Sequence, residues 1–170
     1  PGLKIVVPSS PHDARGLLKS SIYDNNPVLF LEHKLLYKTK GKIKEEDEPI
    51  PIGKGVIKRK GKDFTIVASA LMLHKSMRAA EELQEEEDIS IEVIDIRTIK
   101  PFDKELILNS VDKTGSILIV EEAPYTGGWG AQVVETIEKN MFSNLKKPPL
   151  RLTSPDIPIS AKNELENKRV

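Results

Sequence analysis

The 170-residue chain has 26 basic and 26 acidic side chains, so it has no net charge to attract nucleic acid or an anionic membrane. It contains no cysteine, which excludes disulfide scaffolds, thiolate metal sites and cysteine nucleophiles. We also find no secretory signal and no apolar run as long as a membrane span, and we expect an intracellular protein that is not secreted.

The first forty residues predict a strand, a helix and a second strand. An apolar run at residues 3–7 comes first, and Ser10 or the turn after it can cap a helix that has Pro11 in its first turn. Residues 24–27 (DNNP) end this helix, and a second apolar run follows at residues 28–31. A helix between two strands implies parallel pairing. The unit is too small to be stable alone, so we expect it to be the last piece of a larger sheet.

A charged stretch and a second set of strands come next. Residues 38–48 (KTKGKIKEEDE) have no apolar face and predict a solvated linker. Two apolar runs, 55–59 and 64–68, flank a turn at residues 60–63 and predict a β-hairpin. Ser69 then leads into a helix with an apolar side and a glutamate-rich wet side.

Further strand and helix pairs complete the predicted sheet. Residues 91–96 (IEVIDI) form a buried-type strand, and Asp103 is a good N-cap for a helix that ends near Gly115. Residues 116–120 are a β-branched run, typical of a strand buried on both faces. With a last short strand at 149–152, this alternation predicts an α/β, three-layer sandwich with a mostly parallel sheet.

The stretch from 116 to 137 (SILIVEEAPYTGGWGAQVVETI) is the most informative part of the chain. Its strand is expected to end at Glu121 and Glu122, because Pro124 removes a ladder donor and unpaired carboxylates are unstable in a dry sheet. Thr126-Gly127-Gly128 then allows a backbone or ligand to approach closely, and an amphipathic helix follows. Ligands gather at the carboxyl ends of such strands. The alternative is an ordinary strand-to-helix turn with two solvated carboxylates.

The residues alone do not reveal a catalytic constellation. The three histidines, His12, His33 and His74, lie in different predicted elements without metal-ligand spacing. His33 beside Glu32 at a strand end is the only arguable acid/base residue, whereas the other two fit surface or capping positions. A dinucleotide fingerprint, a phosphate-binding loop with a lysine and a nucleophile elbow are all missing.

Five segments, taken in order, carry a family resemblance: PGLKIVVPSSPHDARGLLKSSIYDNNPVLFLEHKLLY, PIGKGVIKRKGKDFTIVAS, VIDIRTIKPFD, VEEAPYTGGWGAQVVETI and SPDIPI. They resemble the beta subunit of the thiamine-diphosphate-dependent decarboxylase component of 2-oxo acid dehydrogenase complexes (pyruvate, branched-chain 2-oxo acid and acetoin dehydrogenases). VIDIRTIKPFD is similar, more distantly, to the C-terminal domain of transketolase and of deoxyxylulose-phosphate synthase. The resemblance implies three parts. Residues 1–37 end a pyrimidine-binding domain, 38–49 are a charged linker, and 50–170 are a transketolase-type C-terminal domain truncated at its end.

The resemblance further implies an enzyme whose parent form decarboxylates a 2-oxo acid, or cleaves acetoin, on thiamine diphosphate with magnesium and transfers the acyl group to lipoamide. In that family the activating glutamate precedes the segment matched here, and the alpha subunit holds the diphosphate and its magnesium. We therefore assign no catalytic and no cofactor-binding residue and expect this chain alone to be inactive. The sequence does not decide which 2-oxo acid is the substrate.

Implied partners are a second beta subunit, an alpha subunit in an alpha2beta2 heterotetramer, and the lipoyl acyltransferase core, with neither nucleic acid nor membrane. The implied location is the cytoplasm of a bacterium, or the mitochondrial matrix after processing. Two alternatives stay open. The chain is either a non-catalytic module for subunit assembly or a relative of transketolase and deoxyxylulose-phosphate synthase.

The resemblance also implies a bound monovalent cation, potassium, at the end of the first helix. The matching motif is SIYDNN, and the carbonyl oxygens of Ser21, Ile22, Asp24 and Asn26 would be the ligands. Carbonyls at a helix C-terminus lack partners and carry partial negative charge, which suits a hard cation. An ordinary helix C-cap is the alternative.

The only tryptophan, Trp129, follows a glycine turn beside two carboxylates, a position typical of an interface anchor. We expect Tyr125 and Trp129 to be buried against a second beta chain, with Thr126-Gly127-Gly128 permitting close approach. The alternative is that Trp129 folds down onto its own helix and covers Val133.

Overall fold

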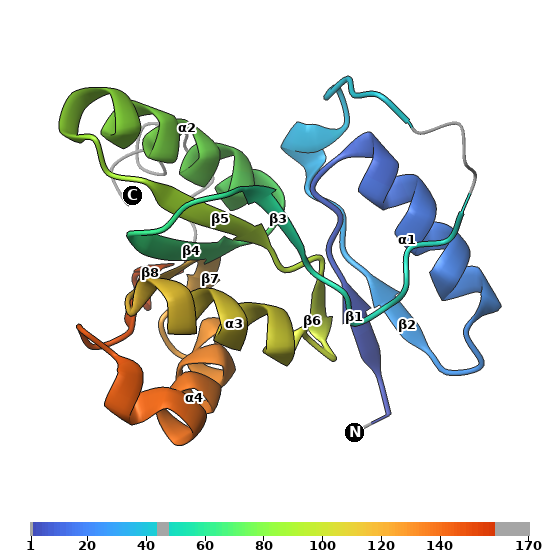
Figure 1. Cartoon of the computed structure of the whole chain (residues 1–170). Helices are drawn as coiled ribbons and strands as arrows, with labels where there is room; N and C mark the ends of the chain where they lie inside the picture. The colour runs from blue at the N-terminus through green and yellow to red at the C-terminus, as the bar shows by residue number, and fades with distance from the viewer. Residues whose placement is uncertain (1, 44–47, 159–170) are drawn as a thin grey trace.

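The computed structural model describes residues 2–43 and 48–158, and its strands in this part of the chain form two sheets (Figure 1). The first sheet has three strands in the order β2-β1-β6, and the second has five in the order β3-β5-β4-β7-β8. No helix within these residues is both long and apolar enough to cross a membrane.

The first unit, residues 2–37, has the strand–helix–strand arrangement predicted from the sequence. It contains β1 (Lys4–Val6), α1 (Pro11–Tyr23), β2 (Val28–Phe30) and the short 3₁₀-helix η1 (Lys34–Leu36). β1 and β2 are parallel, as expected. Ser10 is the N-cap of α1, because its hydroxyl oxygen accepts from the Asp13 amide at 3.2 Å, and Pro11 occupies the first helical turn.

The third strand of this sheet comes from much later in the chain and was not predicted. β6 (Thr98–Lys100) pairs with β1 in the antiparallel direction. The Val7 amide extends the pairing by donating to the Arg97 carbonyl at 2.7 Å. Ile50 also packs into the core of the first unit, where a Cβ on Gly16 would lie 2.5 Å from its side chain. Residues beyond the linker therefore complete the first unit.

The predicted division at 1–37, 38–49 and 50–170 stays a prediction, since nothing fixes where an independent domain begins. Part of the predicted linker, residues 44–47, and part of the predicted second domain, residues 159–170, lie outside the described residues.

The second sheet is the centre of a three-layer sandwich. Its strands are β3 (Val56–Arg59), β4 (Phe64–Ala68), β5 (Ile91–Asp95), β7 (Ile117–Pro124) and β8 (Leu150–Ser154). β5, β4, β7 and β8 are parallel, and the edge strand β3 is antiparallel to β5. This confirms the prediction of a mostly parallel sheet.

Helices cover both faces of this sheet (Figure 1). They are α2 (Ala70–Glu87), α3 (Lys104–Thr114) and α4 (Gly130–Met141), and the 3₁₀-helix η2 (Phe142–Asn144) follows α4. α2 packs on one face around Ile66 and Val93, whereas α3 and α4 pack on the other around Val67 and Ile119. The predicted N-cap at Asp103 and the C-cap at the left-handed Gly115 are both present.

The predicted hairpin between β3 and β4 is wrong, because β5 lies between these two strands. The connection crosses the beginning of β5, where the Lys62 and Asp63 amides donate to the Ser90 carbonyl at 3.0 and 2.9 Å. A Cβ on Gly61 would lie only 2.1 Å from the Ile91 carbonyl carbon. The glycine therefore serves a close crossing of two chain segments and not a tight turn.

The predicted end of the strand at Glu121 is also wrong, since β7 continues to Pro124. Its pairing with β8 shifts register between Val120 and Pro124. Glu121 stays inside the strand and is only 3% exposed. A carboxylate is stable there because a partner strand supplies an opposite charge.

Candidate functional site

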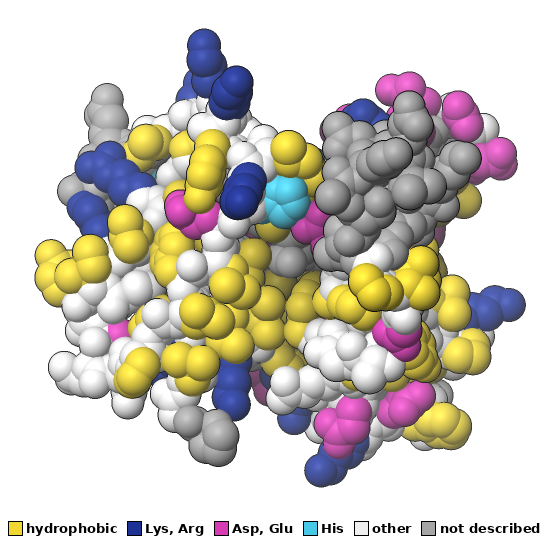
Figure 2. Space-filling model, turned by 180° about the vertical axis from the view of Figure 1, so that it is seen from behind, with side chains coloured by type: hydrophobic (Ala, Val, Ile, Leu, Met, Phe, Trp, Pro, Cys, Tyr) yellow, Lys and Arg dark blue, Asp and Glu magenta, His cyan; other side chains and the backbone are white. Residues whose placement is uncertain are grey.

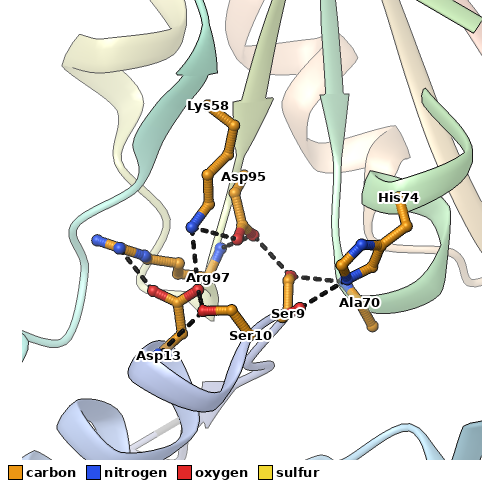
Figure 3. A network of polar contacts seen from close by, with 8 residues as sticks. All are labelled: Ser9, Ser10, Asp13, Lys58, Ala70, His74, Asp95 and Arg97. Carbon is orange, nitrogen blue, oxygen red and sulfur yellow. Dashed lines mark hydrogen bonds and ion pairs between the residues drawn. The ribbon is translucent and has the colours of Figure 1, made fainter. Parts of the chain in front are cut away.

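A buried polar network joins the first unit to the second sheet (Figure 3). Ser9, in the loop after β1, donates its hydroxyl hydrogen to Asp95 Oδ1 at 3.0 Å and accepts from the Ala70 amide at 2.8 Å. His74 Nε2 donates to the Ser9 carbonyl at 2.7 Å. One serine therefore connects β1, the end of β5 and the beginning of α2.

Two acidic and two basic side chains lie at the centre of the same network. Lys58 Nζ lies 3.1 Å from Asp13 Oδ2 and 3.8 Å from Asp95 Oδ2, and Arg97 Nη2 lies 2.5 Å from Asp13 Oδ1. Both carboxylates are fully buried. Charge balance makes this burial possible, because each buried carboxylate faces a cation from another segment.

The two buried aspartates titrate in opposite directions. Burial, together with the nearby Asp13 charge, raises the pKa of Asp95 from 3.8 to about 6. Burial alone would also raise the pKa of Asp13. The hydrogen bond from Ser10 and the charges of Arg97 and Lys58 outweigh that effect and hold its pKa below the ordinary value of 3.8. Between about pH 4 and about pH 6, the proton held by the pair therefore resides on Asp95.

A second buried ion pair lies at the acidic strand end that the sequence singled out. Arg151 of β8 donates from Nε and Nη2 to Glu121 Oε1 at 2.9 and 2.6 Å. The Gly130 amide, at the beginning of α4, donates to Glu121 Oε2 at 3.1 Å. The alternative of two solvated carboxylates is therefore wrong for Glu121, which binds a cation on one side and a helix N-terminus on the other.

Two of the glycines in this turn are needed for that ion pair. A Cβ on Gly128 would lie 2.6 Å from both Arg151 Nη2 and Glu121 Oε2, and a Cβ on Gly130 would lie 2.5 Å from Glu121 Oε1. The close approach that these glycines permit is therefore to side chains of their own chain. Gly127 differs, because it has a φ of +78° and nothing lies within 4 Å of its Cβ position.

The loop tip, residues 125–127, is exposed and firmly held. The Thr126 amide and hydroxyl donate to the two carboxylate oxygens of Asp156 at 2.9 and 2.7 Å. These bonds lower the pKa of Asp156 below 3.8. The Arg151 guanidinium carbon lies 5.0 Å from the centroid of the Tyr125 ring, and 64% of Tyr125 is exposed.

Trp129 lies differently from the loop tip. It is half-buried and packs against the core cluster that contains Val133. This agrees with the alternative prediction, in which Trp129 folds down onto its own helix. It also lines a cavity of about 190 Å³ between the two sheets, together with Val7, Ile99 and Glu122. Burial of Tyr125 and Trp129 against a second chain stays a prediction.

His33 connects the first unit to the end of β7. Its Nδ1 accepts from the Leu35 amide at 3.2 Å, so Nε2 carries the hydrogen that faces Glu122 Oε1 at 3.0 Å. Glu32 and His33 line both the cavity beside Trp129 and a neighbouring one of about 210 Å³. Both ring nitrogens therefore have partners within the chain, and the acid/base role of His33 stays a prediction.

The four predicted cation ligands lie in the last turn of α1 and the turn after it. Ser21 donates its hydroxyl hydrogen to the Leu17 carbonyl at 2.7 Å, and Ile22 is exposed. Asp24 is the C-cap; its carboxylate forms an ion pair with Lys4 and accepts from the Asn26 amide at 2.9 Å. These contacts, with that of Lys4 first, lower the pKa of Asp24 to about 2. The backbone carbonyls are thus the atoms available to a cation, and the site stays a prediction.

Among residues 2–43 and 48–158, no three His, Cys, Asp or Glu side chains lie close enough together to hold a metal ion. The buried carboxylates of this part of the chain are Asp13, Asp95, Asp103, Glu92 and Glu121, and each faces a cation or a helix amide. The buried carboxylates of the described residues are therefore bound within the chain, and whether any residue here contacts the cofactor stays a prediction.

Apolar side chains are also exposed, and Figure 2 shows them gathered on the face of the molecule seen from behind. On the first unit, the large exposed apolar residues are Leu3, Leu18, Ile22, Tyr23, Leu29, Leu31, Leu35 and Tyr37. Exposed apolar surface of this kind is typical of interaction surfaces.

Sequence reasoning missed the cations of the two buried networks. Arg151 sits between two leucines in a short strand, and an arginine inside such a strand is a signal for a buried carboxylate on a neighbouring strand. Lys58 and Arg97 carried no comparable signal, because Lys58 stands in a run of basic residues (KRK) and Arg97 follows the end of a predicted strand.

Comparison with known proteins agrees with this architecture. The family model described as "Transketolase, C-terminal domain" matches residues 53–169. The pyruvate dehydrogenase E1 component subunit beta of Bacillus subtilis is 45% identical over 157 residues, which is 92% of this chain and 48% of the relative. The 2-oxoisovalerate dehydrogenase subunit beta of the same organism is 45% identical over 159 residues, 93% of this chain and 48% of the relative.

A solved structure described as "Split gene transketolase, inactive beta4 tetramer" is similar with a TM-score of 0.81 and 26% identity, covering 99% of this chain and 53% of that chain. The chain spans about half the length of the curated relatives it matches. Since the matched span includes the whole five-stranded sheet and its covering helices, the chain belongs to the transketolase C-terminal domain family.

Proposed function

We propose that the chain is the C-terminal portion of the beta subunit of a 2-oxo acid dehydrogenase. The whole enzyme would use thiamine diphosphate with magnesium to decarboxylate a 2-oxo acid and would pass the acyl group to lipoamide. The observation that carries this proposal is the 45% identity to the beta subunits of two such dehydrogenases over 92% and 93% of the chain. Because the two identities are equal, pyruvate and 2-oxoisovalerate are both candidate substrates, with acetoin as a third.

Within that enzyme, we propose that the described residues serve assembly and not the chemical step. Their buried carboxylates form internal ion pairs and hydrogen bonds, so an activating carboxylate and the diphosphate site would come from other segments or from the alpha subunit. The exposed loop tip and the apolar surface of the first unit support a role in subunit contacts. A relative that covers this chain over 99% of its length is described as an inactive tetramer of beta chains.

The proposed partners are a second beta subunit, through Tyr125, Thr126, Gly127, Gly128 and Trp129, then an alpha subunit and a lipoyl acyltransferase core. The curated relatives come from bacteria, which supports the bacterial cytoplasm as the location. Potassium at the end of α1 is a separate proposal, supported by the helix carbonyls that end there.

A chimera tests the proposed function. The chain replaces the matched half of the Bacillus subtilis 2-oxoisovalerate dehydrogenase subunit beta, and the product is co-expressed with the alpha subunit of that enzyme. Decarboxylation of pyruvate and of 2-oxoisovalerate is then measured with thiamine diphosphate and magnesium. Turnover well above that of the unfused N-terminal half with the alpha subunit is the expected result.

The chain on its own is expected to give no more turnover than a blank that contains only the cofactor. Activity above that blank would contradict the assignment of the chemical step to other segments. A chimera that assembles with the alpha subunit but turns over neither 2-oxo acid would favour the non-catalytic module, and ketol transfer in its place would favour the transketolase relative.

A further inference from the structure

The loop tip, residues 125–127, is exposed and is also held in place by other parts of the same chain. It is exposed, with 64% of Tyr125 accessible and open space around Gly127. It is also held by β8 and the segment after it at four points. An exposed turn usually keeps its freedom, since ordering it costs conformational entropy that solvent contact does not repay.

The first two fixing points involve Asp156. Its two carboxylate oxygens accept separately from the Thr126 amide, at 2.9 Å, and from the Thr126 hydroxyl, at 2.7 Å. An amide–carboxylate bond and a hydroxyl–carboxylate bond to one residue fix both its backbone and its side chain. Asp156 lies 30 residues further along the chain, so this contact is not part of the local turn.

The third fixing point involves Arg151. Its guanidinium lies over the Tyr125 ring, 5.0 Å from the ring centroid, while Glu121 holds it from the other side through two hydrogen bonds. Arg151 also lowers the pKa of Asp156, so its charge reaches both contacts of the loop tip. The Tyr125 amide donates to the Ser154 carbonyl at 3.1 Å, which fixes the base of the tip.

We propose that Asp156 and Arg151 are positioning residues that hold the loop tip in the shape in which it docks on a second copy of this chain. This inference rests on the proposed assembly function. A surface that is already ordered before binding does not lose that entropy on association, so the same contacts give a tighter complex. One solved structure supports a second copy as the occupant, because it covers 99% of this chain and is described as "Split gene transketolase, inactive beta4 tetramer".

The test is self-association of the whole chain, measured by sedimentation over a dilution series. Asp156→Ala removes both acceptors and is expected to weaken association about tenfold, the size of effect that loosening a contact loop produces. Asp156→Asn keeps one acceptor oxygen and is expected to weaken self-association less than Asp156→Ala does. Asp112→Ala is the matched control, because Asp112 is also exposed and accepts one hydrogen bond, from Asn144, far from the loop tip.

A second pair of variants does not change charge. Thr126→Val removes the hydroxyl donor and keeps the side-chain shape, and it is expected to weaken association. Thr126→Ser restores the donor and is expected to restore association. Thr136→Val is the matched control, since the Thr136 hydroxyl bonds only within α4, to the Gln132 carbonyl. In all these variants the unfolding midpoint of the monomer is expected to match that of the matched control.

The outcomes separate the inference from the proposal beneath it. A wild-type chain that stays monomeric at every concentration overturns both. If the wild-type chain associates and Asp156→Ala and Thr126→Val associate equally well, the positioning role is overturned and the assembly function stands. A lowered unfolding midpoint with unchanged association would reduce Asp156 to a residue that stabilises the fold, and would overturn the inference as well.

Discussion

The Ser9 hydroxyl group donates to the Asp95 carboxylate across 3.0 Å, and this bond connects the loop after β1 to the end of β5. Burial, with the nearby Asp13 charge, raises the pKa of Asp95 from 3.8 to about 6. Between these two values the folded protein holds a proton that the unfolded chain has released. The contribution of Asp95 to stability is therefore full below about pH 4 and is lost as the pH rises through about 6, a change of at most about 3 kcal/mol.

Asp95→Asn is expected to remove this loss, because asparagine cannot ionise but keeps an acceptor for the Ser9 hydroxyl. Urea unfolding of both proteins between about pH 4 and about pH 7 measures the difference. Asp13 has a lowered pKa, so its contribution is present above pH 3.8 and is lost only below that value, outside the window. Asp63→Asn, at an exposed carboxylate that accepts from the Ser90 amide, is the control, and an equal flattening in that variant would contradict the assignment to Asp95.

Glu121→Gln and Arg151→Met are each expected to destabilise the protein by about 3 to 5 kcal/mol, because each leaves a buried partner without its opposite charge. The double variant is expected to lose less than the sum of the two, and a double-mutant cycle from urea unfolding measures the coupling. Lys54→Met removes a pair in which only Lys54 is exposed, 3.8 Å from Asp103, and is expected to lower the free energy of unfolding by less than about 1 kcal/mol, because the Gly55 and Leu106 amides still donate to Asp103. Strictly additive losses would show that Glu121 and Arg151 do not act as a pair.

Gly130→Ala is expected to destabilise the protein by about 1 to 3 kcal/mol, although alanine is normally the better residue within a helix. The added methyl group would lie 2.5 Å from Glu121 Oε1 and 2.8 Å from the Ile119 side chain. Ala131→Gly, at the exposed next position, reports the ordinary helix preference. The measurement is the thermal unfolding midpoint of the two variants. A midpoint of Gly130→Ala above that of the wild type would mean that the turn can move away from Glu121.

Asp24→Ala tests the cation at the end of α1. If potassium binds there, the variant is expected to lose more thermal stability in potassium chloride than in an equal concentration of tetramethylammonium chloride, at the same ionic strength. Lys4→Met is the control, because it removes the same ion pair but keeps the Asp24 side chain, which accepts from the Asn26 amide and so orients the carbonyls of the turn; its loss of thermal stability should be equal in both salts. If Asp24→Ala also loses the same thermal stability in both salts, the ordinary helix C-cap is the interpretation that remains.

Local sequence patterns were sufficient for those features whose causes are local. Ser10, Asp103 and Gly115 cap helices because a short polar side chain or a left-handed glycine satisfies the nearest backbone groups, and these groups lie within a few residues. The β-branched runs predicted central strands because burial on both faces demands apolar residues throughout. The three-layer arrangement follows from the alternation of such strands with amphipathic helices.

Features that depend on pairing between distant segments could not be predicted. Residues 60–63 have the composition of a hairpin turn, and only the insertion of β5 between the flanking strands shows that they are a crossing. β6 is only three residues long and is a strand because it pairs with β1. A segment this short carries no strand signal in its own sequence. Glu121 was expected to be in water because its partner, Arg151, lies 30 residues away.

The pairing of β6 with β1 also constrains the order in which the protein folds. Val6 of β1 pairs with Thr98 of β6, far along the chain, so the contacts that complete the first sheet form late on a growing chain. Until residue 100 has left the ribosome, one edge of β1 has no strand beside it. An unpaired edge next to apolar side chains is a site for aggregation, so β6 protects this edge of β1 once it has paired.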